Sequence, residues 1–274
     1  MNPVNSSHWA ILTDVTKCIG CESCVEGCRE ANHTGEDRPW AWQNGVRDLS
    51  ASRWTTIDRL PGNHYIRRQC RHCISPACAS ACPVGALKKT PEGPVVYDAV
   101  KCMGCRYCMM ACPFQIPRYS WDSAVPAVRK CVLCHDRIER GEATEPACTA
   151  ACPTEATVFG SREELLKEAR KRIEAAPELY RNHVWGETEA GGTNVLTISD
   201  VDIPLPNTVP TDALPERTWA ALKTVPYAFI GAGVGMLGLR WIMGRRNELR
   251  EAEARAQAAR AEEEARAAAE ECEE

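Results

Sequence analysis

The stretch from Cys102 to Pro113 carries four cysteines in the pattern C-x2-C-x2-C-x3-C-P. Three thiols spaced three residues apart can surround one corner of a compact metal cluster, and the fourth lies one helical turn further on. The chain contains this pattern once and three related patterns, which together take sixteen of its 17 cysteines. The four quartets are Cys18, Cys21, Cys24 and Cys28; Cys70, Cys73, Cys78 and Cys82; Cys102, Cys105, Cys108 and Cys112; and Cys131, Cys134, Cys148 and Cys152.

The spacing is typical of ligands to [4Fe–4S] clusters, in which the fourth cysteine reaches the neighbouring cluster. The fourth quartet is the same pattern with a polar loop, HDRIERGEATEPA, inserted between its second and third cysteines. Zinc needs only four ligands in two pairs, so C-x2-C-x2-C offers more thiols than zinc uses. A disulfide between cysteines so close in sequence would be strained. We therefore expect four [4Fe–4S] clusters, and zinc or disulfides are the alternatives.

The composition indicates that these clusters replace much of an ordinary core. The chain has 274 residues and a net charge of −4, and only 6% of its residues are aromatic. A hydrophobic core built from so few aromatic side chains would be thin, so we expect the protein to fold poorly without its metal. The charges are interspersed and form no strong basic stripe, which argues against a nucleic-acid partner.

Regular elements are expected on both sides of the cysteine quartets. Residues 8–17 and 94–100 read as strands that lead into the first and third quartets. Residues 29–69 form an insert of loop and hairpin material, which either covers the clusters or docks a partner through Trp40, Trp42 and Trp54. Gly20 is expected to give the backbone room beside the metal.

A helix is expected to begin at Ser161, because Ser161 and Glu164 form a capping box. Its apolar face consists of Leu165, Leu166, Ala169, Ile173 and Ala176. The proline-rich residues 177–216 that follow have the composition of an extended arm outside the core.

Three residues near or beyond the quartets invite a functional interpretation. His72 and His135 lie next to ligand cysteines, but the cysteines already saturate four clusters. We expect both to be surface or outer-shell residues that tune the clusters without binding them. Cys272 lies far from every quartet, and we expect a free thiol there.

Residues 224–239 carry no charge and predict a membrane span. Sixteen residues in a helix cover about 24 Å, and the flanks extend the apolar region to 220–244, enough for a bilayer core of about 30 Å. Gly231, Gly233, Gly235 and Gly238 favour close packing against another membrane helix. The span has no histidine for haem and no acid for quinone protons, so we expect an anchor only. A buried helix of a soluble protein is the alternative.

The arginines on either side predict the orientation of this span. Arg240, Arg245, Arg246 and Arg250 follow it, against Arg217 and Lys223 before it. The positive-inside rule then places the C-terminus in the cytoplasm and the cysteine quartets outside. The charged tail, residues 247–274, reads as a solvated helix without an apolar heptad.

Clusters in series carry single electrons, and the surrounding protein tunes their potentials. The sequence has no nucleophile–base set, phosphate-binding glycine loop or flavin fingerprint. Chemistry on a substrate would need an incompletely ligated iron, and every quartet is complete. The pattern therefore predicts electron transfer and not catalysis.

Several segments resemble the iron–sulfur subunits of periplasmic nickel–iron hydrogenase and of respiratory formate dehydrogenase. They include PVGALKK, CRYCMMACPFQIPRY, FGSREEL and EAGGTNVL, and the resemblance covers about residues 10–245. It implies an electron-transfer subunit that works between a catalytic oxidoreductase subunit and a quinone-reactive or cytochrome b subunit in the membrane. A soluble polyferredoxin is the alternative.

The resemblance also implies which cysteines share a cluster, because quartet one pairs with four and quartet two with three. The implied groups are Cys18, Cys21, Cys24 and Cys152; Cys131, Cys134, Cys148 and Cys28; Cys70, Cys73, Cys78 and Cys112; and Cys102, Cys105, Cys108 and Cys82. The first two groups would lie near the catalytic subunit and the last two near the membrane subunit.

We therefore expect an α+β fold with two ferredoxin-like units, each holding two [4Fe–4S] clusters, a C-terminal extension and one transmembrane helix. The expected divisions are 8–28 with 128–160 (first unit), 65–120 (second unit), 29–64 (insert and candidate docking surface), 161–218 (helix and arm), 219–244 (anchor) and 245–274 (cytoplasmic tail).

The expected location is the bacterial inner membrane, crossed once, with the cluster domain on the periplasmic side. The first residues, MNPVNSSHWAIL, lack the charge and the apolar run of a signal peptide and contain no twin arginine. We therefore expect export together with a partner that carries a signal.

Overall fold

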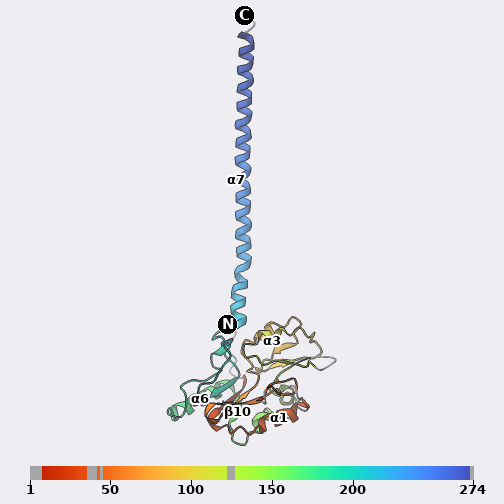
Figure 1. Ribbon diagram of the computed structural model, residues 1–274, viewed down its shortest axis with the longest axis vertical. Helices are drawn as coiled ribbons and strands as arrows, with labels where there is room; N and C mark the ends of the chain where they lie inside the picture. Colours follow the sequence, from red (N-terminus) through yellow and green to blue (C-terminus); the bar gives the residue numbers. More distant parts are fainter. Residues whose placement is uncertain (1–7, 36–41, 44–45, 122–126, 272–274) are drawn as a thin grey trace. The chain divides into compact units, whose positions relative to one another are not determined.

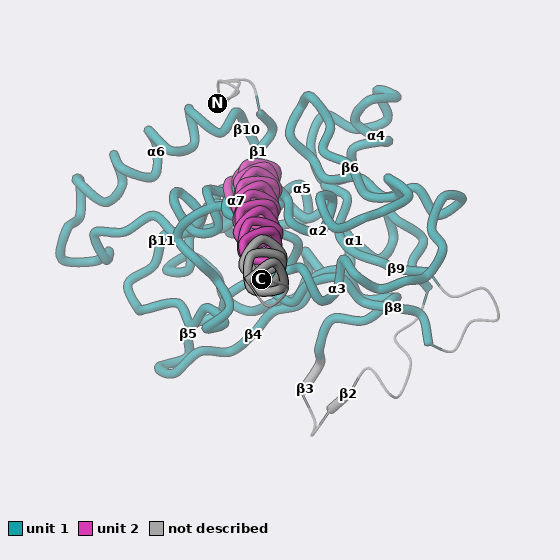
Figure 2. The backbone as a smooth tube through the Cα atoms, turned by 90° about the horizontal axis from the view of Figure 1, so that it is seen from above, with its two compact units in different colours: residues 1–217 teal, residues 218–274 magenta. Residues whose placement is uncertain are grey.

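The computed structural model describes residues 8–35, 42–43, 46–121 and 127–271. The chain divides into two compact units, Met1–Arg217 and Thr218–Glu274, which Figure 2 colours separately. Trp40 and Cys272, which the sequence singled out, lie outside the described residues, as does the side chain of Trp42. The first unit mixes helices and strands, as the α+β expectation requires.

A three-stranded sheet forms the centre of the first unit, with β1 (Trp9–Asp14) between β10 (Thr157–Ser161) and β11 (Val195–Ile198). β1 runs antiparallel to β10, with Ile11 opposite Phe159, and parallel to β11, with Leu12 opposite Leu196. Strand β1 confirms the strand predicted over residues 8–17, and the 3-10 helix η1 (Val15–Lys17) then leads into the first quartet.

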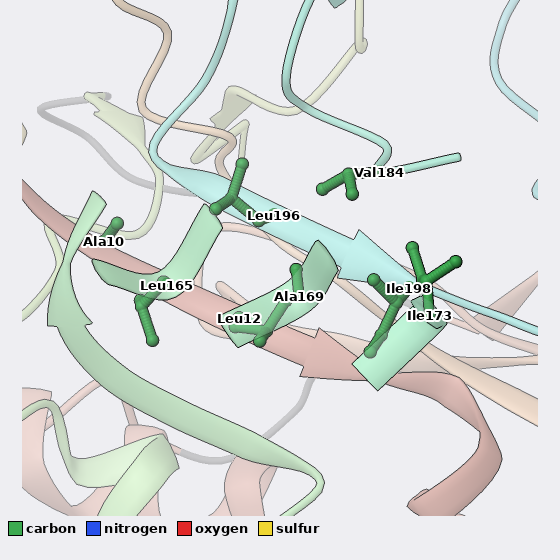
Figure 3. Packing of buried hydrophobic residues seen from close by; sticks show 8 residues of the cluster. All are labelled: Ala10, Leu12, Leu165, Ala169, Ile173, Val184, Leu196 and Ile198. Carbon is green, nitrogen blue, oxygen red and sulfur yellow. The ribbon is translucent and has the colours of Figure 1, made fainter. Parts of the chain in front are cut away.

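Helix α6 (Arg162–Ala175) covers one face of this sheet (Figure 3). Its N-terminus follows the prediction, because the Ser161 side chain accepts a hydrogen bond from the Glu164 backbone N–H. The buried face consists of the predicted Leu165, Ala169 and Ile173, and Leu166 is partly buried. These side chains pack against Ala10, Leu12, Val184, Leu196 and Ile198.

The expectation that residues 177–216 form an arm outside the core is wrong. Strand β11 lies within this segment and is buried along its whole length. Its flanks are buried too, although they are polar: Asn194 and Ser199 are 0% exposed. Their polar groups are partly satisfied by neighbours: the Asn194 side-chain amide donates a hydrogen bond to the Gly93 carbonyl oxygen at 3.1 Å, whereas its Oδ1 has no partner among the described residues. Hydrogen bonding of this kind lowers the penalty for burying polar residues.

Four two-stranded hairpins complete the strands of this unit. They pair β2 (Trp42–Gln43) with β3 (Val46–Arg47), β4 (Thr56–Leu60) with β5 (His64–Arg68), β6 (Leu87–Lys89) with β7 (Val95–Tyr97), and β8 (Arg118–Tyr119) with β9 (Val128–Arg129). The first two confirm the hairpin material expected in the insert, and β7 confirms the strand predicted over 94–100. The 3-10 helix η3 (Pro61–Asn63) forms the turn of the second hairpin.

Short helices lie within or beside the cysteine quartets, and four of them carry Cys24, Cys28, Cys78, Cys108 and Cys148. The helices are α1 (Ser23–Asn32), α2 (Ala77–Ser80), α3 (Tyr107–Ala111), α4 (His135–Glu139) and α5 (Ala147–Ala150), and a last 3-10 turn, η4, spans Glu189–Gly191. Figures 1 and 2 place α6 and α3 on opposite sides of the first unit. The cysteine-bearing helices α1 and α5 pack against each other, and so do α2 and α3.

The described part of the second unit is helical. It lies within one long helix, α7 (Leu214–Glu271), which begins shortly before this unit and contains Pro226 (Figure 1). Its segment Leu214–Arg260 has a window of mean hydropathy 1.3 that is 0% buried, long and apolar enough to cross a membrane. The helix includes the predicted span, residues 220–244, and continues into the charged tail. It is therefore longer than the predicted span alone.

Candidate metal centres

The four loops between the first two cysteines of each quartet share one backbone feature. The residue just before the second cysteine is left-handed in all four, with φ of 71° at Gly20, 48° at His72, 75° at Gly104 and 59° at Leu133. Glycine adopts this conformation freely, whereas other residues pay about 1–3 kcal/mol. The common turn brings the two thiols of each C-x2-C pair to the same side of the loop.

Tyrosines cover the two loops that contain glycine. A Cβ at Gly20 would lie 2.6 Å from the Tyr65 ring, and a Cβ at Gly104 would lie 2.9 Å from the Tyr119 hydroxyl oxygen. A side chain at Gly20 would therefore collide with the Tyr65 ring, and the predicted room beside the metal stays a prediction. His72 and Leu133 are 0% and 1% exposed, so packing of their side chains holds the same turn in the other two loops.

Paired helices bring the last cysteine of one quartet to the first three of another. Helix α1 carries Cys24 and Cys28, and its partner α5 carries Cys148 and ends just before Cys152. The two helices approach closely at Gly27, where an added Cβ would lie 3.0 Å from the Ala151 Cβ. Helices α2 and α3 repeat this arrangement with the second and third quartets.

The first group, site 1, surrounds a small cavity. Its lining contains Cys18, Cys21 and Cys24 together with Cys152 of the fourth quartet. Cys21 is exposed, whereas Cys24 is buried. Burial raises the pKa of the Cys24 thiol to about 11, with the thiols of Cys148, Cys18 and Cys152 as further causes.

The second group, site 2, consists of Cys131, Cys134, Cys148 and Cys28, all of them buried. The side-chain amide of Asn32 bridges two of them, with its nitrogen 3.6 Å from the Cys28 Sγ and 4.0 Å from the Cys134 Sγ. Burial raises the pKa of the Cys28 thiol, and the nearby thiols of Cys148 and Cys134 raise it further. Cys28 of the first quartet therefore lies among cysteines of the fourth.

The third group, site 3, consists of Cys70, Cys73, Cys78 and Cys112. Burial raises the pKa of the Cys73 thiol, and the charges of Cys70, Cys112 and Cys78 act in the same direction. Burial also raises the pKa of the Cys78 thiol to about 12, whereas the charge of the buried Lys130 acts to lower it. Lys89 stabilises the loop between Cys70 and Cys73. Its amine donates hydrogen bonds to the carbonyl oxygens of His72 and Cys73 at 3.2 and 2.8 Å.

The fourth group, site 4, also lines a small cavity. Cys102, Cys105 and Cys108 face it together with Cys82 of the second quartet. The Ala86 backbone N–H donates a hydrogen bond to the Cys82 Sγ at 3.2 Å. Burial raises the pKa of the Cys108 thiol to about 11, and Cys102, Cys105 and Cys82 add to the rise.

The four sites follow one another in a series, because each neighbouring pair shares an apolar cluster. Cys24 of site 1 and Cys148 of site 2 pack in one cluster with Ile11 and Leu133. The corresponding pairs are Cys131 and Cys70 between sites 2 and 3, and Cys78 and Cys108 between sites 3 and 4. Packed apolar side chains therefore connect neighbouring sites, and buried ligand cysteines belong to each of these apolar groups.

The donor sets fit [4Fe–4S] clusters. All sixteen quartet cysteines are free thiols, and each site offers four of them. Burial raises the pKa of several of these thiols, so they hold a proton in the absence of metal; they are Cys24, Cys28, Cys78, Cys108 and Cys131. A coordinating thiol is deprotonated by the metal, so cluster assembly would release these protons.

The two histidines beside ligand cysteines are buried and do not lie on the surface. His72 is 0% exposed, and its Nδ1 accepts a hydrogen bond from the Val95 backbone N–H at 2.9 Å. His135 is 7% exposed and packs its ring 5.6 Å from that of Trp9. The surface alternative is therefore wrong for both residues, and outer-shell roles stay predictions.

Buried cations near the thiols have no obvious signal in the sequence. Arg67 lines the cavity of site 1 and is 3% exposed. Lys130 is 2% exposed, and its amine donates to the carbonyl oxygens of Val95 and Cys131. Such residues are usually exposed, so only their positions beside ligand cysteines could have singled them out.

A family model described as a 4Fe–4S dicluster domain matches residues 62–162, which include the last three quartets. A protein of Nitratidesulfovibrio vulgaris is 36% identical over 269 residues, covering 93% of this chain and 72% of that protein. The hydrogenase-2 operon protein HybA of Escherichia coli O157:H7 is 37% identical over 231 residues, or 70% of each chain. The formate dehydrogenase iron–sulfur subunit of Haemophilus influenzae is 36% identical over 248 residues, covering 84% of this chain and 77% of that subunit.

Proposed function

We propose that the chain connects a catalytic subunit to a quinone-linked membrane subunit. The chain belongs to the family of [4Fe–4S] electron-transfer subunits that includes HybA and the formate dehydrogenase iron–sulfur subunits. The chain is a non-catalytic subunit of an oxidoreductase complex, and its cofactors are [4Fe–4S] clusters. When bound, these clusters supply one-electron carriers whose potentials the protein tunes.

Sixteen cysteines hold four such clusters in the proposed arrangement. Sites 1 and 2 form the first two-cluster unit around α1 and α5, and sites 3 and 4 form the second around α2 and α3. The crossing of Cys152 into site 1 and of Cys82 into site 4 supports this pairing. So does the Asn32 amide, which lies near thiols from two quartets.

The observation that carries the proposal is the serial order of the four sites. Its two middle members are largely buried, whereas each end reaches the surface, at the exposed Cys21 of site 1 and beside Met103 of site 4, which is 65% exposed. A series with accessible ends and a buried middle suits transfer between two partners. A soluble carrier is not favoured, since α7 contains a window apolar enough to span a membrane.

Exposed apolar side chains at site 4 fit contact with the membrane partner. Val84 and Met103 line its cavity, and Val100, Tyr107 and Met110 lie nearby in sequence at 96%, 60% and 87% exposure. Exposed apolar groups of this kind mark interaction sites. The site 4 edge, Val84, Val100, Met103, Tyr107 and Met110, is therefore the proposed contact with the membrane subunit, and site 1 the proposed contact with the catalytic subunit.

The experiment that tests this function follows cluster reduction in anaerobic membranes that contain the whole complex. Either hydrogen or formate should bleach the cluster absorption, and a quinone analogue should restore it. In a Met103→Glu/Met110→Glu variant, bleaching should persist while recovery slows at least about tenfold, equivalent to ~1.4 kcal/mol. Leu179→Glu changes an exposed leucine on another part of the unit. It should alter neither the bleaching of the cluster absorption nor its recovery. Reduction by neither donor, or normal recovery in the double variant, would contradict the proposal.

The anchor and its orientation are also proposed. A single membrane-crossing helix agrees with α7, and its side chains from Leu222 to Met243 are exposed. Added Cβ atoms at Gly231, Gly235 and Gly238 would meet nothing within 4 Å, which leaves this side of the helix open to a membrane partner. The arginines after the span favour a cytoplasmic C-terminus and a periplasmic cluster domain at the bacterial inner membrane.

A reporter fused after Glu274 checks this orientation. We expect a fluorescent protein at that position to fluoresce in the cytoplasm and alkaline phosphatase to be inactive. The reason is that the arginines after the span keep the C-terminal tail in the cytoplasm. A second fusion after Arg217, before the span, should give the opposite result. Phosphatase activity at Glu274 would overturn the proposed sidedness and leave the electron-transfer function intact.

A further inference from the structure

A buried arginine lies where the first two sites meet. Arg67 belongs to β5 and pairs with Ile57 of β4. It lines the cavity of site 1 and is 3% exposed. All three of its guanidinium nitrogens are buried; none meets a hydrogen-bonding oxygen or nitrogen among the described residues, and the thiol of Cys148 faces them. A single thiol leaves most of the five buried donors unmatched, which is costly, so this arrangement indicates that something else also faces the guanidinium.

Thiols of both sites raise the pKa of the Arg67 guanidinium. Burial opposes the charge of Arg67, but the thiols of Cys148 in site 2 and Cys24 in site 1 outweigh it and leave the guanidinium pKa above its ordinary value. The effect is mutual, because Arg67 works against the burial that raises the pKa values of Cys24 and Cys28. One cation therefore faces the thiols of two neighbouring sites.

No carboxylate offsets this cation within the described part of the chain. Glu22 also lines the site 1 cavity, but its carboxylate pairs with Arg53 at 2.9 Å. The adjacent Arg68 makes a direct contrast. It points to the other face of the hairpin, where it pairs with Asp58 and Asp48, both at 2.6 Å. Arg68 is compensated and partly exposed, whereas Arg67 is buried and uncompensated.

We propose that Arg67 sets the reduction potentials of the clusters held at sites 1 and 2 by raising both. Reduction adds one negative charge to a cluster, and a nearby buried cation stabilises the reduced form. Because Arg67 faces both sites, it also offsets the repulsion that an electron at one site exerts on an electron at the next. This inference rests on the proposed four-cluster function and its cysteine pairing.

The test is a redox titration of the purified complex, followed by electron paramagnetic resonance, with Arg67→Gln. We expect two of the four midpoint potentials to fall, each by at least a tenfold change in the reduction equilibrium, or about 59 mV for one electron. The other two should stay unchanged. Arg68→Gln is the matched control and should move none. Arg67→Lys keeps a charge and should retain most of the wild-type potential. Unchanged potentials in Arg67→Gln, or equal shifts in Arg67→Lys and Arg67→Gln, would overturn the proposal.

A measurement on wild-type protein covers the case in which Arg67→Gln fails to assemble. Pulsed resonance on protein labelled with 15N-arginine should detect guanidinium nitrogen coupled to the reduced clusters of sites 1 and 2. The coupling should vanish in Arg67→Lys and persist in Arg68→Lys. Its absence from the wild type would overturn the proposal. If the four-cluster function itself is wrong, iron content and the number of resonance signals will already be low in the wild type.

Discussion

Replacing Cys152 with serine is expected to remove the cluster held by Cys18, Cys21 and Cys24, and to leave the one held by Cys131, Cys134 and Cys148. The reason is geometric, because Cys152 faces the site 1 cavity although it follows Cys148 in sequence. The loss of one cluster should lower the iron content by about a quarter, roughly four atoms of sixteen. Iron analysis and resonance spectra of the anaerobically purified protein measure both effects.

The reciprocal variant sharpens this prediction. Cys28→Ser should disturb site 2, because Asn32 holds the Cys28 sulfur near that of Cys134. Thus each substitution should affect the cluster of the quartet to which the cysteine does not belong. Loss of the site 2 signal in Cys152→Ser, with site 1 intact, would show that each quartet binds its own cluster.

Ending the chain after Arg217 is expected to move it from the membrane fraction to the soluble fraction without loss of iron. The first unit, which ends at this residue, contains every quartet, and the apolar window of α7 is 0% buried. The test expresses the truncated and complete chains without partner subunits and compares their partition and iron content. Burial of an apolar span contributes far more to membrane attachment than any surface contact.

A second truncation provides the control for this experiment. A chain that ends after Arg250 keeps the span and its flanking arginines and loses only the charged tail, so it should stay in the membrane. Attachment of the Arg217 truncation would assign membrane binding to the first unit. Loss of iron from that truncation would show that α7 supports the metal sites as well.

Local patterns explain which elements could be predicted from the sequence. The capping box at Ser161 and the helical spacing of Leu165, Ala169 and Ile173 identified α6, because local chemistry determines that helix. Strand β1 likewise follows from its apolar run. The quartet spacings identified the candidate ligands because thiol geometry around a cluster is local to a few residues.

Tertiary packing decided the features that the sequence did not reveal. Strand β11 was missed because Thr197 and the polar flanks at Asn194 and Ser199 look exposed, and only long-range pairing with β1 buries them. The left-handed turns at His72 and Leu133 carry no glycine signal. Arg67 looks like an ordinary surface residue of a hairpin, since alternation alone cannot say which face of an isolated hairpin meets the rest of the unit.

The central claim, a series of four [4Fe–4S] clusters held by sixteen cysteines, is tested most directly by counting iron and acid-labile sulfide. Protein purified without oxygen should contain about sixteen of each per chain, four clusters of four. Reduction should then produce resonance signals from interacting clusters, as the shared apolar contacts between neighbouring sites require. About eight atoms of iron, or zinc in stoichiometric amounts, would contradict the account.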